Sequence, residues 1–171
     1  MVDRTRTLVV MRHGEAEPTG PSDLERALAA PGHDEAEGVG RWLRERGVTP
    51  DAALVSAARR TRETWERVSA AAGWALVPTV DDGLYTADAE TALDLVRLLD
   101  DTVVTALLVG HNPTVHSLVS LLDDGEGDAE AGNEMLLGTF PTSATAVLTC
   151  TGPWGDLAPG RASLVGYHVG R

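Results

Sequence analysis

Short apolar runs alternate along this chain with longer stretches in which apolar residues recur every three or four positions. The short runs are typical of buried strands, and the longer spacing is typical of helices that bury one face. The predicted strands cover residues 7–11, 52–56, 74–78, 105–109, 144–149 and 162–169. The predicted helices cover residues 33–46, 60–72, 89–99 and 113–122, the last with Asn112 as its N-cap and Pro113 as its first residue.

This alternation predicts a mostly parallel sheet, because parallel strands are joined by crossover connections that are usually helices. We therefore expect an α/β fold, a three-layer αβα sandwich around a mostly parallel central sheet. A length of 171 residues suits one domain, and no linker or internal repeat divides residues 1–171.

The charge of the chain narrows its expected partners. The formal net charge is −12, and all 14 basic residues are arginine. Such an acidic chain is not expected to bind nucleic acid, which requires a basic face. No apolar stretch reaches the length of a membrane helix, and the first residues lack a signal-peptide core, so we expect a cytoplasmic protein with no membrane partner. Cys150 is the single cysteine, which excludes a disulfide within the chain.

One segment, from Asp123 to Glu134, holds six acidic residues and three glycines in twelve positions. This composition predicts a solvated loop. A second interpretation is an acidic rim that influences which substrates approach.

Two segments far apart in the chain place a histidine where a predicted strand ends. Arg12, His13 and Gly14 follow the first strand, and His111 follows the fourth. Ligands of open α/β sheets bind outside the carboxyl ends of the strands, so these residues are expected to meet at one anion. The guanidinium of Arg12 matches phosphate oxygens, and His111 lies beside a helix N-terminus, which favours an anion. His13 is then placed to attack phosphorus through a neutral ring nitrogen.

A third segment adds positive charge. Arg59, Arg60 and Arg62 fall at the start of the helix after the second strand, where cations oppose the helix dipole. A bound anion would compensate for that charge. For Arg59 and Arg62 the alternative is an ordinary solvated surface, with Glu63 or Glu66 as the partner.

Three motifs resemble those of the histidine phosphatase superfamily, the phosphoglycerate mutase-like group. They are Arg12-His13-Gly14, the spacing Ser56-x-x-x-Arg60-x-x-x-Thr64, and the turn Gly110-His111-Asn112-Pro113. The resemblance implies a phosphoglycerate mutase-like fold and a phosphatase in which His13 is transiently phosphorylated, with no metal or other cofactor. It assigns the side chains of Arg12, Arg60 and His111 to binding of the phosphoryl group. It assigns two further residues, Gly14 and Asn112, to contact with the substrate.

Other segments resemble the SixA-type branch of this superfamily. They are residues 22–30 and the segment from Phe140 to Ala144, in a chain of similarly small size. The branch implies a phosphorylated protein carrying phosphohistidine as the substrate. The alternative within enzymes is a phosphatase for small phosphomonoesters, such as sugar or nucleotide phosphates. The alternative outside enzymes is a non-catalytic module that binds phosphate.

The chain departs from the superfamily at the general acid. Mutase-like members carry a glutamate between the second and third motifs that protonates an alkoxide leaving group, and this chain has none in the matching neighbourhood. Asp82 or Asp81 could supply the proton if burial raised its pKa, and the resemblance offers Asp23 as a further candidate. The alternative for Asp81 and Asp82 is a solvated turn. A missing acid favours a phosphoramidate such as phosphohistidine, whose nitrogen leaves more easily than an alkoxide.

Overall fold

A six-stranded sheet forms the centre of the computed structural model, which describes residues 4–170. The strands lie in the order β3-β2-β4-β1-β5-β6. Their bounds are β1 (Thr5–Arg12), β2 (Ala52–Ser56), β3 (Thr79–Asp81), β4 (Thr105–Gly110), β5 (Thr145–Thr151) and β6 (Ser163–His168). The strands β1 to β4 pair in parallel, while β5 and β6 run antiparallel to their neighbours. The prediction of a mostly parallel sheet is confirmed.

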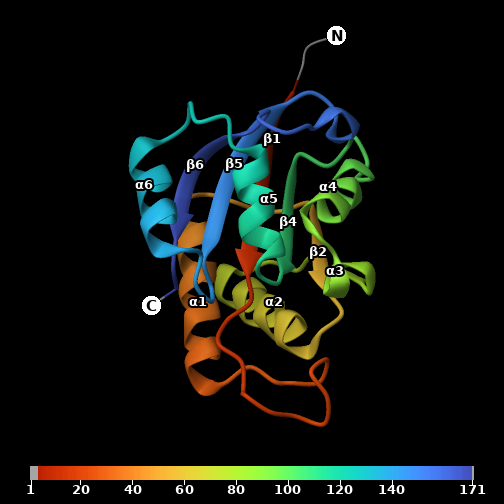
Figure 1. The fold of residues 1–171 in the computed structure, drawn as a ribbon, viewed down its shortest axis with the longest axis vertical. Coiled ribbons are helices and arrows are strands. Elements are labelled where there is room, and N and C mark those ends of the chain that lie inside the picture. Colours follow the sequence, from red (N-terminus) through yellow and green to blue (C-terminus); the bar gives the residue numbers. More distant parts are fainter. Residues whose placement is uncertain (1–3, 171) are drawn as a thin grey trace.

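Helices cover both faces of the sheet (Figure 1). They are α1 (Ala30–Glu45), α2 (Arg59–Ala72), α3 (Gly83–Thr86), α4 (Ala89–Arg97), α5 (Thr114–Leu122), α6 (Ala129–Gly138) and the 3-10 helix η1 (Trp154–Asp156). Successive side chains of β1 point to opposite faces of the sheet. Val9 and Met11 pack with the apolar stripes of α1 and α2, whereas Leu8 and Val10 pack with those of α4 and α5. The predicted αβα sandwich is therefore confirmed. Within residues 4–170 no helix is both long and apolar enough to span a membrane.

Parallel pairing brings the carboxyl ends of β1, β2 and β4 together. Arg12 lies opposite Gly110 in the β1–β4 pair, and Val55 lies opposite Val109 in the β2–β4 pair. The apolar residues of these strands are buried on both faces, which fixes the register. The polar residues that end or follow each strand therefore meet at one edge of the sheet.

The strand predicted at residues 74–78 is wrong. These residues form no regular element and pair with no strand, and the ladder to β2 begins at Thr79, opposite Leu54. Trp74 instead stacks on Trp65 of α2, with ring centroids 5.9 Å apart. The run at residues 74–78 is apolar because this connecting segment packs on α2, and not because it belongs to the sheet.

The acidic segment is a loop only in its first half. Residues from Ala129 onward form α6, and the carboxylate of Asp128 caps it by accepting from the Ala131 N–H at 2.9 Å. Asp128 as a cap and Glu130 in the first turn were the signals for this helix start. The prediction of a loop over the whole segment is therefore wrong.

The helix α5 begins one residue later than predicted. It starts at Thr114 with Pro113 at the cap position. The Asn112 side chain still accepts from a helical N–H, that of His116 at 3.3 Å, and its amide also donates to the Phe140 carbonyl at 2.8 Å. Asn112 therefore links the helix start to the loop before β5 instead of serving as a simple N-cap.

A close approach between two glycines anchors the segment after β1 on α1. A Cβ placed on Gly32 would lie 2.1 Å from the Glu15 carbonyl oxygen, and one on Gly14 would lie 2.6 Å from the Gly32 carbonyl oxygen. Neither position has room for a side chain, because the obstacle is backbone in both cases. This contact holds the backbone beside His13 in place.

We predict that Gly32→Ala destabilises the protein by about 1–3 kcal/mol, the range typical of overpacking. Gly38→Ala, in the same helix, is the matched control. Its added Cβ meets Gly170 at an ordinary 3.6 Å, so this variant should be neutral or slightly more stable. Urea unfolding of both variants measures the difference, and equal stabilities would contradict the role of the glycine contact.

Candidate active site

His13 lies directly after β1, buried, with only 7% of its surface exposed. Its Nδ1–H donates to the Gly14 carbonyl at 2.7 Å, which fixes the tautomer and leaves the lone pair on Nε2. The pKa of His13 is lowered to about 3, chiefly by burial, and the neighbouring His111, Arg60 and Arg12 act in the same direction, against the hydrogen bond to Gly14. The ring is therefore neutral at physiological pH, the state that a nucleophile needs.

His111 follows β4 and faces His13 with ring centroids 5.4 Å apart. Its Nδ1 lies 3.4 Å from Nη2 of Arg60, which can only donate, so the ring proton belongs on Nε2. That Nε2–H donates to the hydroxyl oxygen of Ser56 at 2.7 Å. Burial lowers the pKa of His111 to about 4, with the charge of Arg60 as the next cause.

Arg60 is buried at the first turn of α2, with 6% of its surface exposed. Its Nη1 donates to the Asp23 carbonyl at 2.8 Å, and its Nη2 contacts both the Asp23 carboxylate and His111. Its Nε is buried and has no hydrogen-bond acceptor among the described residues. A buried donor of this kind needs an acceptor, and an oxyanion would provide one.

Arg12 reaches the site from the last position of β1. Its Nη1 donates to the Phe140 carbonyl at 3.3 Å, and its Nε, like that of Arg60, is buried without an acceptor in residues 4–170. Phe140 is fully buried with a positive φ of 57°, and its carbonyl also receives the Asn112 amide. The Phe140 carbonyl thus positions Arg12 and Asn112 together.

The second motif supports the site through each of its three residues. Ser56 holds His111, and Arg60 supplies the guanidinium. The Thr64 hydroxyl donates to the Arg60 carbonyl at 2.7 Å and accepts from the Gly14 N–H at 3.1 Å. The roles of Ser56 and Thr64 were not predicted from the sequence. Their spacing of four residues on either side of Arg60 was the signal.

The other arginines at the start of α2 face the surface. Arg59 is exposed and pairs with Glu63 at 3.3 Å, as the alternative interpretation proposed. Arg62 is exposed as well and donates through Nε to the Ala57 carbonyl at 3.1 Å.

The three candidate acids lie in different environments. Oδ1 of Asp81 accepts from the N–H groups of Gly83 and Leu84, at 2.7 and 3.3 Å, and so caps α3. Asp82 is exposed next to it. Asp82 thus lies in an exposed bend, as the alternative interpretation described, whereas Asp81 is the half-buried last residue of β3. Asp23 lies against Arg60 at 3.2 Å.

Asp23 is held as a carboxylate. Its Oδ2 accepts from the Tyr85 hydroxyl at 2.5 Å, and this bond lowers the pKa of Asp23, with the charges of Arg60 and Arg26 acting in the same direction. A carboxylate that is ionised at neutral pH has no proton to donate to a leaving group. The same bond raises the pKa of Tyr85, whose ring lies edge-on to His111 at 5.7 Å. The sequence analysis missed Tyr85, which lies on the unpredicted short helix α3.

Glu35 of α1 was also missed. Its buried carboxylate accepts from the Glu15 N–H at 3.3 Å and from the Thr142 hydroxyl at 3.1 Å. Its charge raises the pKa of Arg12, which burial otherwise lowers. Glu35 therefore joins the segment after His13 to the loop before β5 and supplies negative charge near Arg12. Its spacing from Val39, one turn along the buried stripe of α1, was the available signal.

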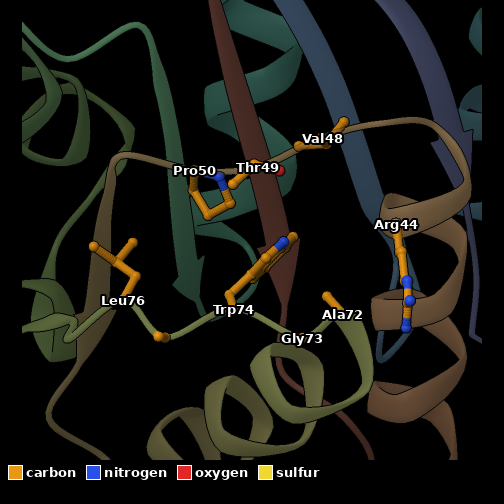
Figure 2. Close-up of a pocket in the computed structure, with 9 residues that line it drawn as sticks. Arg44, Val48, Thr49, Pro50, Ala72, Gly73, Trp74 and Leu76 are labelled. Atoms are coloured by element: carbon orange, nitrogen blue, oxygen red, sulfur yellow. The ribbon is translucent and has the colours of Figure 1, made fainter.

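A hollow of about 400 Å³ lies at the other end of the sheet (Figure 2). Its lining comes from the ends of α1 and α2 and from the segments that precede β2 and β3, including Arg44, Pro50, Trp74 and Leu76. None of the candidate active-site residues lines it. The site described above lies instead at the carboxyl ends of the strands, where the topology predicts a ligand.

The arrangement of two histidines and two arginines at the carboxyl ends of β1, β2 and β4 is that of a phosphatase. The family model of the histidine phosphatase superfamily (branch 1) matches residues 8–92. The chain belongs to this superfamily. Phosphohistidine phosphatase SixA of Escherichia coli is 33% identical over 148 residues, which cover 82% of this chain and 83% of that protein. An uncharacterized protein of Mycobacterium tuberculosis is 40% identical over 164 residues, which cover 94% of this chain and 100% of that protein.

Solved structures agree with this family and fold. A protein assigned as phosphohistidine phosphatase SixA of Nakamurella multipartitia superposes with a TM-score of 0.82 at 33% identity, covering 96% of this chain and 95% of its own. The protein histidine phosphatase SixA in complex with tungstate superposes with a TM-score of 0.77 at 26% identity, covering 95% of this chain and 96% of its own. The phosphoglycerate mutase-like αβα fold is therefore confirmed.

The lowered pKa values of His13 and His111 predict how stability depends on pH. An unfolded histidine titrates near pH 6.5, whereas these two titrate at about 3 and about 4 in the folded protein. Between pH 6.5 and 4 the unfolded chain therefore binds more protons at these two rings than the folded protein does. The free energy of unfolding is unaffected by these rings above pH 6.5 and decreases as the pH falls below it, by up to about 1.4 kcal/mol per pH unit for each ring. His13→Gln should therefore lose less stability than the wild type between pH 7 and pH 5, measured by urea unfolding. If His13→Gln lost as much stability as the wild type between pH 7 and pH 5, the result would contradict the lowered pKa of His13.

We predict that Glu35→Ala lowers kcat for p-nitrophenyl phosphate about 10- to 100-fold, because it leaves the segment after His13 misplaced. The matched control is Glu37→Ala on the same helix, which removes a carboxylate that pairs with Arg67 at 3.1 Å at the surface. Thermal unfolding shows whether each variant is folded. If folded Glu35→Ala retained wild-type kcat and KM, Glu35 would have no positioning role.

Proposed function

We propose that this phosphatase hydrolyses phosphohistidine in proteins through a covalent phosphohistidine intermediate on His13. The observation that carries the proposal is the convergence of His13, His111, Arg12 and Arg60 at one edge of the sheet. The rings of His13 and His111 lie with centroids 5.4 Å apart, Nη2 of Arg60 lies 3.4 Å from Nδ1 of His111, and Arg12 directly precedes His13 at the end of β1.

The first step is attack by Nε2 of His13 on phosphorus. The Gly14 carbonyl holds the proton on Nδ1, so the lone pair on Nε2 is available. A phosphoryl group in transfer spreads its charge over three equatorial oxygens. The guanidinium groups of Arg12 and Arg60 are the donors proposed for these oxygens. His111 joins them through Nδ1 when the negative charge of the phosphoryl group favours the protonated form of its ring. The buried Nε atoms of both arginines then gain the acceptor that they lack in the free enzyme.

The second step is hydrolysis of the phosphorylated His13 by water. Water attacks phosphorus in line, the bond to Nε2 breaks, and its electron pair returns to the ring, which restores the neutral nucleophile. The same arginines hold the phosphoryl oxygens in both steps. In this proposal all the positive charge comes from side chains, and the reaction uses no metal.

The substrate class rests on two observations. The named relative that matches over 82% of this chain is a phosphohistidine phosphatase, whereas the named phosphoglycerate mutases match over less than half of it. A protein histidine phosphatase SixA was solved with tungstate, a tetrahedral oxyanion like phosphate. The second is the state of Asp23, the candidate acid that contacts Arg60, which is held ionised and so offers no proton to an alkoxide. A nitrogen leaving group does not depend on that proton.

Trapping of the intermediate tests the proposed function. Brief mixing with a ³²P-labelled phosphohistidine peptide, followed by alkaline denaturation, should leave label on the protein in an acid-labile bond, and His13→Ala should carry none. A panel of phosphohistidine peptide, phosphoserine peptide, sugar phosphates and nucleotides should rank the phosphohistidine peptide first by kcat/KM. Preferred hydrolysis of a sugar or nucleotide phosphate would instead identify a small-molecule phosphatase.

We predict that Arg60→Ala lowers kcat about 10³-fold, the scale measured for arginines that stabilise a transferring phosphoryl group. The matched control is Arg59→Ala, which removes the neighbouring guanidinium on the same helix turn. Arg59 is exposed and paired with Glu63, so its loss should change the rate less than about twofold. Equal effects of the two substitutions would show that the general positive charge of α2 matters and that the position of Arg60 does not.

A further inference from the structure

Asp23 lies in the segment between β1 and α1, which extends past the carboxyl end of the sheet and lies along the start of α2 (Figure 1). The Leu24 carbonyl accepts from the Arg59 N–H at 2.9 Å, which docks this segment on α2. The Asp23 side chain is 57% exposed, in contrast to Arg60 at 7%. The carboxylate is therefore fixed at the solvent side of a buried guanidinium.

Two hydrogen-bond donors and one ion pair hold the carboxylate in one orientation. Its Oδ2 accepts from Nη2 of Arg60 at 3.2 Å and from the Tyr85 hydroxyl at 2.5 Å, and its Oδ1 pairs with Nε of Arg26 at 3.2 Å. All three partners stabilise the ionised form. Carboxylate oxygens accept more than one hydrogen bond each, so an exposed oxygen still has lone pairs for a further donor.

The place of this carboxylate relative to the reaction follows from Arg60. Nη2 of Arg60 lies 3.2 Å from Oδ2 of Asp23 and 3.4 Å from Nδ1 of His111. Asp23 and His111 therefore contact the same nitrogen of Arg60, which places Asp23 next to the groups around the proposed phosphoryl position. In-line transfer puts the leaving group opposite the buried nucleophile His13, on the open side, where Asp23 is exposed.

We infer that Asp23 is a specificity-determining residue whose ionised carboxylate accepts a hydrogen bond from an N–H of the leaving group, so that the site favours phosphorus–nitrogen over phosphorus–oxygen substrates. This inference rests on the proposed function and adds the group that recognises the substrate. Asp23 contacts the departing imidazole and gives it no proton.

The transfer step balances without an acid. In a phosphohistidine with a protonated second ring nitrogen, Nε2 of His13 forms a bond to phosphorus and the substrate phosphorus–nitrogen bond breaks. The electron pair of that bond stays on the substrate ring, which was cationic and leaves as neutral imidazole with its N–H intact. Asp23 keeps that N–H protonated by accepting from it, because an opposite charge nearby favours the cationic form.

The same carboxylate disfavours oxygen leaving groups. An alkoxide or phenolate leaves with negative charge, which the Asp23 carboxylate repels at short range. The ionised form also has no proton to neutralise that charge. One side chain therefore acts on the two substrate classes in opposite directions.

The test compares two substrates in each variant, a phosphohistidine peptide and p-nitrophenyl phosphate. Asp23→Asn keeps the size of the side chain but removes its charge, and the ratio of kcat/KM for phosphohistidine to that for p-nitrophenyl phosphate should fall at least tenfold. Asp23→Glu should recover part of this ratio. Glu17→Gln, which removes an exposed carboxylate from the same segment, is the control and should keep the wild-type ratio.

The ratio separates recognition of the leaving group from support of Arg60. Loss of the ion pair with Arg60 alone would slow both substrates alike and leave the ratio unchanged, and that result would overturn the inference while leaving the proposed function intact. If the wild type hydrolysed p-nitrophenyl phosphate but not phosphohistidine, the proposed substrate class and the inference would both fail.

Discussion

Positive groups held close together and largely out of water are the constraint on which this active site depends. Arg12 and Arg60 lie with the neutral ring of His111 around a buried imidazole, and the charge of the two arginines adds to the effect of burial in keeping His13 unprotonated. Gathering like charges in a region of low dielectric is unfavourable without an anion. The free protein offsets the cost in part with the carboxylates of Asp23 and Glu35. A phosphoryl dianion compensates for the gathered positive charge more fully. The same positive charge therefore both attracts the anion and keeps the nucleophile His13 neutral.

The scaffold keeps this arrangement rigid through contacts that are mostly to backbone. The Gly14 backbone fixes the tautomer of His13 through its carbonyl, and its N–H is fixed in turn by Thr64. The Gly32 backbone closes on the same segment from α1. Arg12 is set by a carbonyl of the loop before β5, and His111 by the hydroxyl of Ser56. Reacting groups that are fixed before substrate arrives need little reorganisation during transfer.

The sequence was sufficient to predict five of the six strands and the residues that follow β1 and β4 at the carboxyl edge of the sheet. Buried parallel strands have a strong signature in continuous apolar runs, and their parallel pairing brings Arg12, His13 and His111 together without further information. The sequence did not reveal Glu35 or Tyr85, because their partners lie far away in the chain and neither belongs to a motif. Glu35 meets Thr142 from the other end of the protein, and Tyr85 meets Asp23 from a short helix that has no apolar periodicity. The strand expected at residues 74–78 failed because an apolar run also arises where a connecting segment packs on a helix.

A crystal structure of the protein with bound tungstate tests most directly whether the four side chains share one tetrahedral anion. We expect a single tungstate whose oxygens lie within hydrogen-bond distance of the guanidinium groups of Arg12 and Arg60 and of the ring of His111. Its tungsten atom should face Nε2 of His13. Tungstate bound elsewhere, or a site in which Arg60 and His111 keep their mutual contact and no anion enters between them and His13, would contradict it.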